Sequence, residues 1–367
     1  MTVNSIIEQA GFIMKCVKNP RVLYSTHPLA FQIYGGAEVQ LLKTKEYLEK
    51  TGKCTIKLFD LFNDIIKDYD IMHNFMMYDD CMRLVQMAKS VGVKIVLSPI
   101  YWRGLGDSVK PLTPSFFERL YSNFRYYGYL TQTNLFPFKN FLELADIILP
   151  NSQLEANLLS RDFRINSKKF WVVPNGADET FAEGKPRLFA EKYGMTDYVL
   201  YVGRFVHRKN PMGVIKACKE LNLPLVIIGS SSPREEQYYL DCKEMAESVG
   251  NIKLIGFLPH ESEELRSAYA AAKVFVLPSN FETPGLSALE AGLSGCNIVI
   301  TSEGATKEYF RDHALYVNYG NYEDLKQKIK KAYEQPKSGE LKDLILQNYT
   351  WKNTAEKTFQ AYESIIK

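Results

Sequence analysis

Apolar residues along this chain follow two alternating patterns. Short β-branched runs, typical of buried strands, are separated by longer stretches in which apolar positions recur every three or four residues, as on one face of a helix. This alternation predicts parallel sheets that are covered by helices on both faces. Helices are predicted at Ala37–Lys50, Pro211–Leu221, Glu261–Ala272 and Trp351–Ile366. Strands are predicted at Arg21–Ser25, Thr55–Phe59, Asp70–Asn74, Val93–Ser98, Asp146–Leu149, Trp171–Val173, Tyr198–Gly203, Leu225–Gly229, Ile252–Ile255, Val274–Pro278, Asn297–Thr301 and Leu315–Val317.

The alternation occurs twice, and segments rich in glycine and proline separate the two series. These breaks are Pro174-Asn175-Gly176 and Gly184-Lys185-Pro186. We therefore expect an α/β protein with two Rossmann-like, doubly wound domains that face a central cleft, with ligands at the carboxyl ends of the strands. The predicted division is an N-terminal domain at 1–180 with an extra amphipathic helix at 1–20, a C-terminal domain at 181–348, and a final helix in 349–367 that packs back on the N-terminal domain.

Composition narrows the class of protein. Hydrophobic residues make up 46% and charged residues 24% of the 367, and the net charge of +3 is too small to indicate a nucleic-acid partner. The six cysteines form no CxxC pair, which favours a reducing compartment. No apolar run reaches the roughly 18 residues of a membrane-spanning helix. We therefore expect a cytoplasmic protein.

Two acidic pairs could be mistaken for metal ligands. Asp68 and Asp70 precede a predicted strand, so their carboxylates would face away from a site at strand ends. Asp79 and Asp80 suit the start of the next helix as capping residues. Neither pair predicts a metal site.

The most informative run is Asn280–Glu290, which follows a predicted strand and opens a helix of small residues. Thr283 can cap that helix, Pro284 suits its first turn, and Gly285 allows close approach of a ligand to the backbone. The exposed amides at this helix end would attract an anion. Glu282 before the helix and Glu290 in its second turn can accept hydrogen bonds from a hydroxyl-rich ligand. The alternative is that both glutamates are solvated surface charges.

A second informative segment is the basic loop that follows the predicted strand ending at Gly203. Arg204 can hold the oxygens of a diphosphate in a bidentate fork, and Lys209 can add a point charge. Both groups would stabilise a diphosphate leaving group, whose charge grows as its bond to a sugar breaks. The alternative is a loop with ordinary basic residues.

The order and spacing of these motifs resemble glycosyltransferase family 4, whose members have the GT-B fold. The resemblance rests first on Gly203-Arg204 with Lys209, and on the seven residues between Glu282 and Glu290. Other matching stretches are Tyr34-Gly35-Gly36-Ala37-Glu38, Leu149-Pro150-Asn151-Ser152, Val173-Pro174-Asn175-Gly176-Ala177-Asp178, Pro278-Ser279 and Gly304-Ala305-Thr306-Lys307-Glu308.

The resemblance implies an activity. Members transfer a sugar from a nucleoside-diphosphate donor such as a UDP- or GDP-sugar, retain the anomeric configuration and usually need no metal or other cofactor. The acceptor would be a glycan, a lipid-linked molecule or a small molecule, bound on the side of the N-terminal domain. Polysaccharide or glycolipid biosynthesis would be the setting.

The resemblance also assigns roles to matching residues. Arg204 and Lys209 would neutralise the diphosphate, Glu282 would hold the donor sugar, and Glu290 would hold the ribose hydroxyls. The remaining predicted donor contacts are backbone positions, namely Gly35, Gly36, Gly203, Gly285, Leu286 and Ser287.

The chain departs from the family on the acceptor side. Members often carry a histidine at the end of the fourth N-terminal strand, whereas residues 97–103 contain none. His73 is expected to be structural. His27, Tyr101 and Trp102 are candidate acceptor or sugar contacts, with core packing as the alternative for His27.

Two further functional classes remain open. A GT-B epimerase or phosphorylase would share the fold, and the missing histidine suits a non-catalytic nucleotide-sugar-binding protein. The sequence argues against a dinucleotide dehydrogenase, because no GxGxxG motif follows a strand. Aromatic residues between Phe116 and Phe141, and the amphipathic pattern of Ile6–Val17, fit either internal packing or peripheral contact with a membrane.

Overall fold

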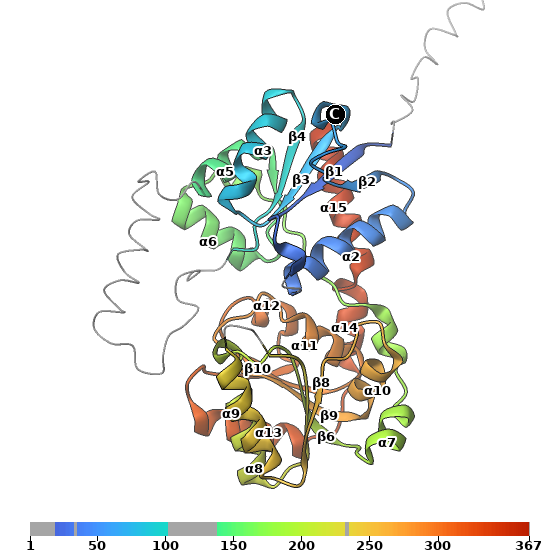
Figure 1. Ribbon diagram of the computed structural model, residues 1–367, viewed down its shortest axis with the longest axis vertical. Helices are drawn as coiled ribbons and strands as arrows, with labels where there is room; N and C mark the ends of the chain where they lie inside the picture. Colours follow the sequence, from blue (N-terminus) through green and yellow to red (C-terminus); the bar gives the residue numbers. More distant parts are fainter. Residues whose placement is uncertain (1–18, 33–34, 102–137, 232–234, 367) are drawn as a thin grey trace, which may run out of the picture.

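Two α/β domains lie one above the other in the computed structural model (Figure 1). The structure describes residues 19–32, 35–101, 138–231 and 235–366. Each domain contains one parallel sheet with helices on both faces, as the alternating sequence pattern predicts. The predicted fold class is therefore confirmed.

The N-terminal sheet has the strand order β2-β1-β3-β4-β5. Alternate residues of its central strands enter two separate cores, because successive side chains of a strand point to opposite faces. Leu23 and Leu97 join the core under α3 and α6, whereas Val22 and Val96 join the core under α2 and α15. The elements are β1 (Arg21–Ser25), η1 (Ala30–Gln32), α2 (Gly36–Lys50), β2 (Thr55–Leu58), η2 (Ile66–Asp68), β3 (Ile71–Phe75), α3 (Asp79–Ser90), β4 (Lys94–Ser98), α5 (Phe138–Leu144), β5 (Ile147–Ile148), α6 (Gln153–Phe163) and η3 (Ser167–Lys169).

The C-terminal sheet has the order β11-β10-β9-β6-β7-β8. The chain builds outward from β6 through β7 and β8, and then outward in the opposite direction from β9 through β10 and β11. The strand order therefore reverses between β6 and β9, and the carboxyl ends of strands at such a point are where ligands bind in doubly wound folds. The elements are η4 (Glu179–Glu183), α7 (Arg187–Tyr193), β6 (Tyr198–Val202), η5 (His207–Lys209), α8 (Pro211–Leu221), β7 (Leu225–Ile228), α9 (Glu236–Glu247), β8 (Ile252–Gly256), α10 (Glu263–Ala271), β9 (Ala272–Leu277), α11 (Leu286–Leu293), α12 (Thr306–Phe310), β10 (Asn297–Thr301), β11 (Ala314–Val317), α13 (Tyr322–Glu334) and α14 (Glu340–Asn348).

The last helix, α15 (Trp351–Ile366), returns to the N-terminal domain, where it packs along α2 (Figure 1). Its Phe359 and Tyr362 join the core beneath β1 and β3. The Tyr362 hydroxyl lies 2.6 Å from Nδ1 of His73, and Ser98 Oγ lies 2.9 Å from Nε2 of the same ring. Burial lowers the pKa of His73 to about 3, so the ring is neutral. His73 is therefore a satisfied core histidine.

The chain crosses between the domains twice, and the two crossings run side by side. Ala177 pairs with Thr350 in an isolated parallel bridge. A Cβ added at Gly176 would overlap the backbone of Thr350 and Trp351, so only glycine allows this close approach.

Four local expectations were wrong. Trp171–Val173 does not form a strand. Phe170 makes an isolated bridge to Ile148 in β5, and the Trp171 and Val173 amides donate to the carbonyls of Ile148 and Pro150. Helix α11 begins at Leu286 after Gly285, which has a φ of 85°, so Thr283 and Pro284 precede the helix. Helix α10 begins at Glu263 because Ser262 caps it. Asp79 and Asp80 occupy the first turn of α3, and Tyr78 is the N-cap.

None of the helices that the structure describes is long and apolar enough to cross a membrane. The five cysteines in the described ranges are free and buried, and Cys16 lies outside those ranges. Within the same ranges no group of three or more His, Cys, Asp or Glu side chains could hold a metal ion. The N-terminal segment 1–18 and nearly all of the aromatic segment 116–141 also lie outside the described residues.

Candidate active site

The predicted donor residues meet at the point where the C-terminal sheet reverses its strand order. Gly203 and Arg204 follow β6, and Glu282 follows the adjacent β9. Gly203 is also in direct contact with Gly229 after β7, where a Cβ would overlap the Gly203 carbonyl. The sequence placed these residues at strand ends, and the topology brings the strand ends together.

Glu282 is a buried carboxylate, 8% exposed, that is held by three neighbours. Ser279 Oγ donates to its Oε1 at 2.7 Å, and Lys209 Nζ lies 3.5 Å from the same oxygen. Arg208 Nη1 lies 3.9 Å away and donates to the Phe281 carbonyl at 2.9 Å. Burial alone would raise the pKa of Glu282, but the two cations and the Ser279 hydroxyl hold that pKa below its ordinary value. The carboxylate is therefore ionised and oriented.

The loop that carries Glu282 is clamped through its backbone. Ala305 N donates to the Glu282 carbonyl at 3.0 Å, and Glu282 N donates to the Glu303 carbonyl at 3.3 Å. Gly304 lies between these bonds with a φ of 93°, and a Cβ there would overlap the Glu282 carbonyl. This contact explains the glycine in the Gly304–Glu308 motif.

Lys209 lies at the end of η5, next to Asn210, which caps α8. Burial lowers the pKa of Lys209, and the attraction of Glu282 only partly opposes that effect. An anionic ligand close to Lys209 would raise this pKa, because a second negative charge stabilises the protonated form of the side chain.

The N-terminus of α11 faces the same region. No side chain caps this helix, so the amides of its first turn, at Leu286 and Ser287, are available to an anionic ligand. Gly285 supplies the left-handed conformation that starts the helix, and a Cβ there would press against Leu277 at 3.1 Å.

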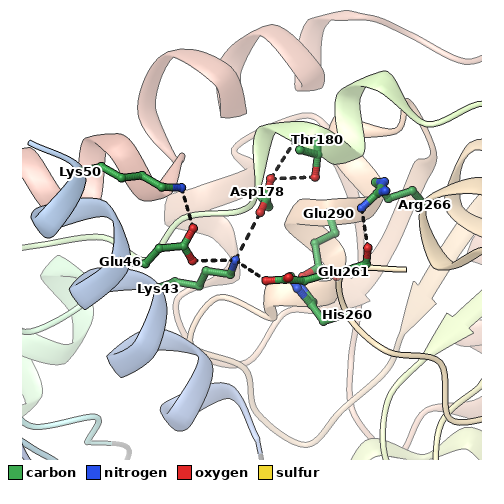
Figure 2. A network of polar contacts seen from close by, with 9 residues as sticks. All are labelled: Lys43, Glu46, Lys50, Asp178, Thr180, His260, Glu261, Arg266 and Glu290. Atoms are coloured by element: carbon green, nitrogen blue, oxygen red, sulfur yellow. Dashed lines mark hydrogen bonds and ion pairs between the residues drawn. The ribbon is translucent and has the colours of Figure 1, made fainter. Parts of the chain in front are cut away.

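Glu290, in the second turn of α11, is 6% exposed. Tyr269 Oη donates to its Oε2 at 2.9 Å. His260, drawn beside Glu290 in Figure 2, places its Nε2 2.7 Å from Oε1. Burial alone would lower the pKa of His260, but the bond to Glu290 outweighs burial and raises it. Each Glu290 oxygen keeps a second lone pair that can accept a ligand hydroxyl.

The N-terminal domain closes the site from the other side. A Cβ at Gly35 would lie 3.8 Å from Arg204 Nη2, and a Cβ at Gly36 would lie 3.8 Å from Leu286 Cδ1. The Gly35 amide already donates to Glu38 Oε2 at 2.8 Å. The Gly35 amide is therefore not available to a ligand, and a phosphate in this turn would have to bind the amides that follow it. The Arg204 guanidinium has no hydrogen bond or ion pair with the described residues.

The candidate acceptor residues are placed differently. His27 Nε2 pairs with Asp80 at 3.1 Å, and its Nδ1 accepts the Leu29 amide at 3.0 Å, so both ring nitrogens are engaged. Tyr101 is 8% exposed, and its hydroxyl donates to Asp162 at 2.9 Å. These interactions give His27 and Tyr101 a structural role that requires no bound sugar. Trp102 lies outside the described residues.

Glu155 supports this part of the N-terminal domain. Its carboxylate accepts the amides of Tyr101 and Asn151, at 2.5 and 2.7 Å, and Ser152 caps the helix α6 in which Glu155 lies. Burial raises the pKa of Glu155 to about 7. The Leu149–Ser152 motif therefore has a structural role: Ser152 caps α6, and the Asn151 amide shares the Glu155 carboxylate with Tyr101, which follows β4.

Four residues of the site were not selected from the sequence: Arg208, Ser279, Tyr269 and His260. Ser279 belongs to the matching stretch Pro278-Ser279 and Arg208 is next to Lys209, so proximity to the motifs was a usable signal. Tyr269 and His260 lie 21 and 30 residues from Glu290, and no local pattern links them to it.

Comparisons with known proteins find similar sequences and similar folds. Residues 187–350 match the family model described as glycosyl transferases group 1. A D-inositol 3-phosphate glycosyltransferase of Corynebacterium jeikeium is 31% identical over 175 residues, which cover 44% of this chain and 42% of that protein. O-antigen chain mannosyltransferase B of Escherichia coli is 26% identical over 60% of this chain and 61% of its own length. The chain spans about half the length of these curated relatives.

Solved structures match over nearly the whole chain. A glycosyltransferase of Rickettsia africae has a TM-score of 0.72 at 14% identity and covers 96% of this chain and 99% of its own. Anabaena HepE in complex with UDP-glucose has a TM-score of 0.68 at 15% identity and covers 94% of this chain and 100% of its own. At such identities the likeness shows the fold. The chain therefore has the GT-B fold, and its residues 187–350 are similar to the group 1 glycosyl transferases, in agreement with the resemblance that the motifs indicate.

Proposed function

We propose that the protein transfers a sugar, with retention of configuration, from a UDP- or GDP-sugar to a glycan, lipid-linked or small-molecule acceptor, without a metal. One observation carries the proposal. Two buried carboxylates lie just before and within α11, whose N-terminus has no side-chain cap: Glu282 and Glu290. Arg204 and Leu286, the first residue of that helix, both lie next to the Gly35-Gly36 turn of the N-terminal domain. Cations and helix amides suit a diphosphate, and oriented carboxylates suit hydroxyl groups.

The proposed chemistry follows from these positions. The bond between the sugar C1 and the diphosphate oxygen breaks, and its electron pair stays on the diphosphate. Arg204, Lys209 and the first amides of α11 stabilise that charge, the work that a divalent cation does in other enzymes. The acceptor oxygen forms the new bond to C1 from the face that the diphosphate leaves. The nearest base for its proton is then an oxygen of the diphosphate itself.

Support for a nucleotide-sugar donor comes also from a relative of the same fold, since HepE has been crystallised with UDP and with UDP-glucose. The buried free thiols favour a reducing compartment, and we infer a cytoplasmic position. Peripheral contact with a membrane is a second part of this proposal, and it is based on the sequence patterns of the N-terminal and aromatic segments. Flotation with anionic liposomes at low salt tests it, and a protein that stays at the bottom of the gradient would rule it out.

The central test is binding followed by turnover. Isothermal titration of the full chain with UDP, GDP, ADP and their sugars should identify one base. Glu290→Ala should weaken that affinity about ten- to a hundredfold, since it deletes charged hydrogen bonds worth roughly 1.5–3 kcal/mol. Glu303→Ala, an exposed glutamate of the same domain, is the control. If no nucleotide binds, or if both variants bind like the wild type, the proposal is wrong.

Turnover separates the transferase from the alternative of a nucleotide-sugar-binding protein. The missing strand-end histidine and the engaged rings of His27 and Tyr101 are the observations that favour a binder. NMR of the incubated donor sugar, with EDTA present, would show release of the nucleoside diphosphate and an anomer of unchanged configuration. Binding without any release would favour the binder.

A further inference from the structure

The loop between β8 and α10 contacts both domains through two consecutive residues. His260 Nε2 lies 2.7 Å from Oε1 of Glu290 in the donor site. Its neighbour Glu261 accepts a hydrogen bond at 3.0 Å from Lys43 Nζ in helix α2 of the N-terminal domain. Figure 2 shows the two side chains leaving the loop toward these partners. A movement of Lys43 would therefore displace the residue next to the one that holds Glu290.

Lys43 is a buried cation with three carboxylate partners from three parts of the chain (Figure 2). Besides Glu261, it pairs with Glu46 at 3.0 Å in its own helix and with Asp178 at 3.5 Å in the interdomain linker. Burial alone would lower the pKa of Lys43, but the carboxylates outweigh burial and raise it, so the side chain stays charged. The cluster therefore ties together α2, the linker and the β8–α10 loop.

His260 is oriented by groups from each element packed against it. Glu290 of α11 faces its Nε2, the Phe181 ring of η4 packs at 5.4 Å, and the charges of Lys43 and Asp178 act on it from α2 and the linker. Tyr269 of α10 holds the other oxygen of Glu290. The Glu290 carboxylate consequently has one support inside its own domain and one that depends on the contact between domains.

We propose that Lys43 is a positioning residue of the nucleotide site. By holding Glu261 across the domain interface, Lys43 sets His260, and through His260 the carboxylate of Glu290, in the orientation that accepts the ribose hydroxyls. The inference rests on the proposed function, because it assigns Glu290 to the nucleotide. Nucleotide affinity is then coupled to domain closure, so binding and closure stabilise each other.

The test compares Lys43→Met with Lys45→Met in the full-length protein. Lys45 is the matched control, since it lies on the same helix and pairs only with Glu49 of that helix among the described residues. Isothermal titration with the nucleoside diphosphate that the wild type prefers should show about five- to tenfold weaker binding for Lys43→Met and no change for Lys45→Met. Glu261→Ala removes the same link at an exposed side chain, where substitution disturbs the packing of the core little.

Two further measurements separate positioning from a general structural effect. Combining Lys43→Met with His260→Gln should weaken binding no more than His260→Gln alone, because both act through Glu290. In NMR titrations without nucleotide, the His260 ring should titrate at lower pH in Lys43→Met, since the weakened bond to Glu290 outweighs the removal of the Lys43 charge, and at the wild-type pH in Lys45→Met.

The outcomes are distinct. Wild-type affinity in Lys43→Met and Glu261→Ala, or additive losses in the double variant, would overturn the role of Lys43 and leave the proposed function intact. A wild-type protein that binds no nucleoside diphosphate would refute the proposed function, and the role of Lys43 with it.

Discussion

The carboxylate of Glu308, in the C-terminal domain, caps a helix of the N-terminal domain at the backbone amide of Gln153. The Gln153 amide donates to both Glu308 oxygens, at 2.8 and 3.0 Å, and the Leu154 amide donates at 3.3 Å. Glu308 follows closely on Gly304 and Ala305, which clamp the loop of Glu282. Glu282 is therefore connected to the N-terminal domain by a short chain of contacts, as Glu290 is through His260, Glu261 and Lys43.

Glu308→Ala should loosen the domain contact. It leaves two amides at the start of α6 without an acceptor, and loss of a helix cap costs about 0.5–2 kcal/mol. We expect faster hydrogen exchange at Gln153 and Leu154 and a lower midpoint of chemical denaturation. Glu303→Ala, five residues away and exposed, should change neither. Unchanged exchange at these amides would show that the cap is not formed in solution.

Arg204→Ala should lower kcat/KM for transfer by about ten- to a hundredfold. The guanidinium has no hydrogen bond or ion pair with the described residues, so its removal deletes a contact to the diphosphate and disturbs little else. Melting temperature should stay within a degree or two of the wild type. Arg187→Ala, at an exposed ion pair of α7, is the control. An Arg204→Ala enzyme with normal kinetics would remove this residue from the site.

Affinity for the nucleoside diphosphate should fall as pH rises through the pKa of Lys209. Burial lowers that pKa, and Glu282 partly restores it, so Glu282→Gln should lower the pKa further. The alkaline fall in affinity should then begin at lower pH in Glu282→Gln than in the wild type, as measured by titration calorimetry at successive pH values. Glu303→Gln should leave the profile in place. A profile that does not move would mean that Lys209 does not meet the diphosphate.

Gly176→Ala should destabilise the protein by more than about 1–3 kcal/mol, the usual cost of overpacking, because backbone atoms rather than a flexible side chain oppose the new methyl group. Urea denaturation measures the loss. Gly250→Ala is the control, since no atom lies within 4 Å of a Cβ there. Equal stability of the two variants would show that the crossings separate in solution.

Much of the fold was readable from local patterns. The β-branched runs gave most strands within one or two residues, because burial on both faces of a parallel sheet imposes a continuous apolar run. The helices α8 and α15 begin and end where the pattern predicts. The start of α11 was misplaced, since Thr283 and Pro284 have the composition of a helix start and only the backbone conformation of Gly285 decides it.

The candidate site likewise contains residues that could be selected from the sequence and residues whose position only the structure shows. Gly203, Arg204, Lys209, Glu282 and Glu290 could be selected because each follows a strand or opens a helix, and strand ends are where doubly wound folds bind ligands. Tyr101 shows the limit of that reasoning. It also follows a strand, yet it turns into the core, where its hydroxyl meets Asp162 sixty-one residues away.

By itself, then, the sequence determined the two-domain α/β architecture and the residues at the strand ends, since hydrophobic period and turn composition are properties of short segments. The tertiary structure alone decided which of these residues share partners. Lys43 and Glu261 are 218 positions apart, and His260 and Glu290 are 30 apart. Such pairs form only when separate helices and loops are packed together, and neither member carries a local signal of the other.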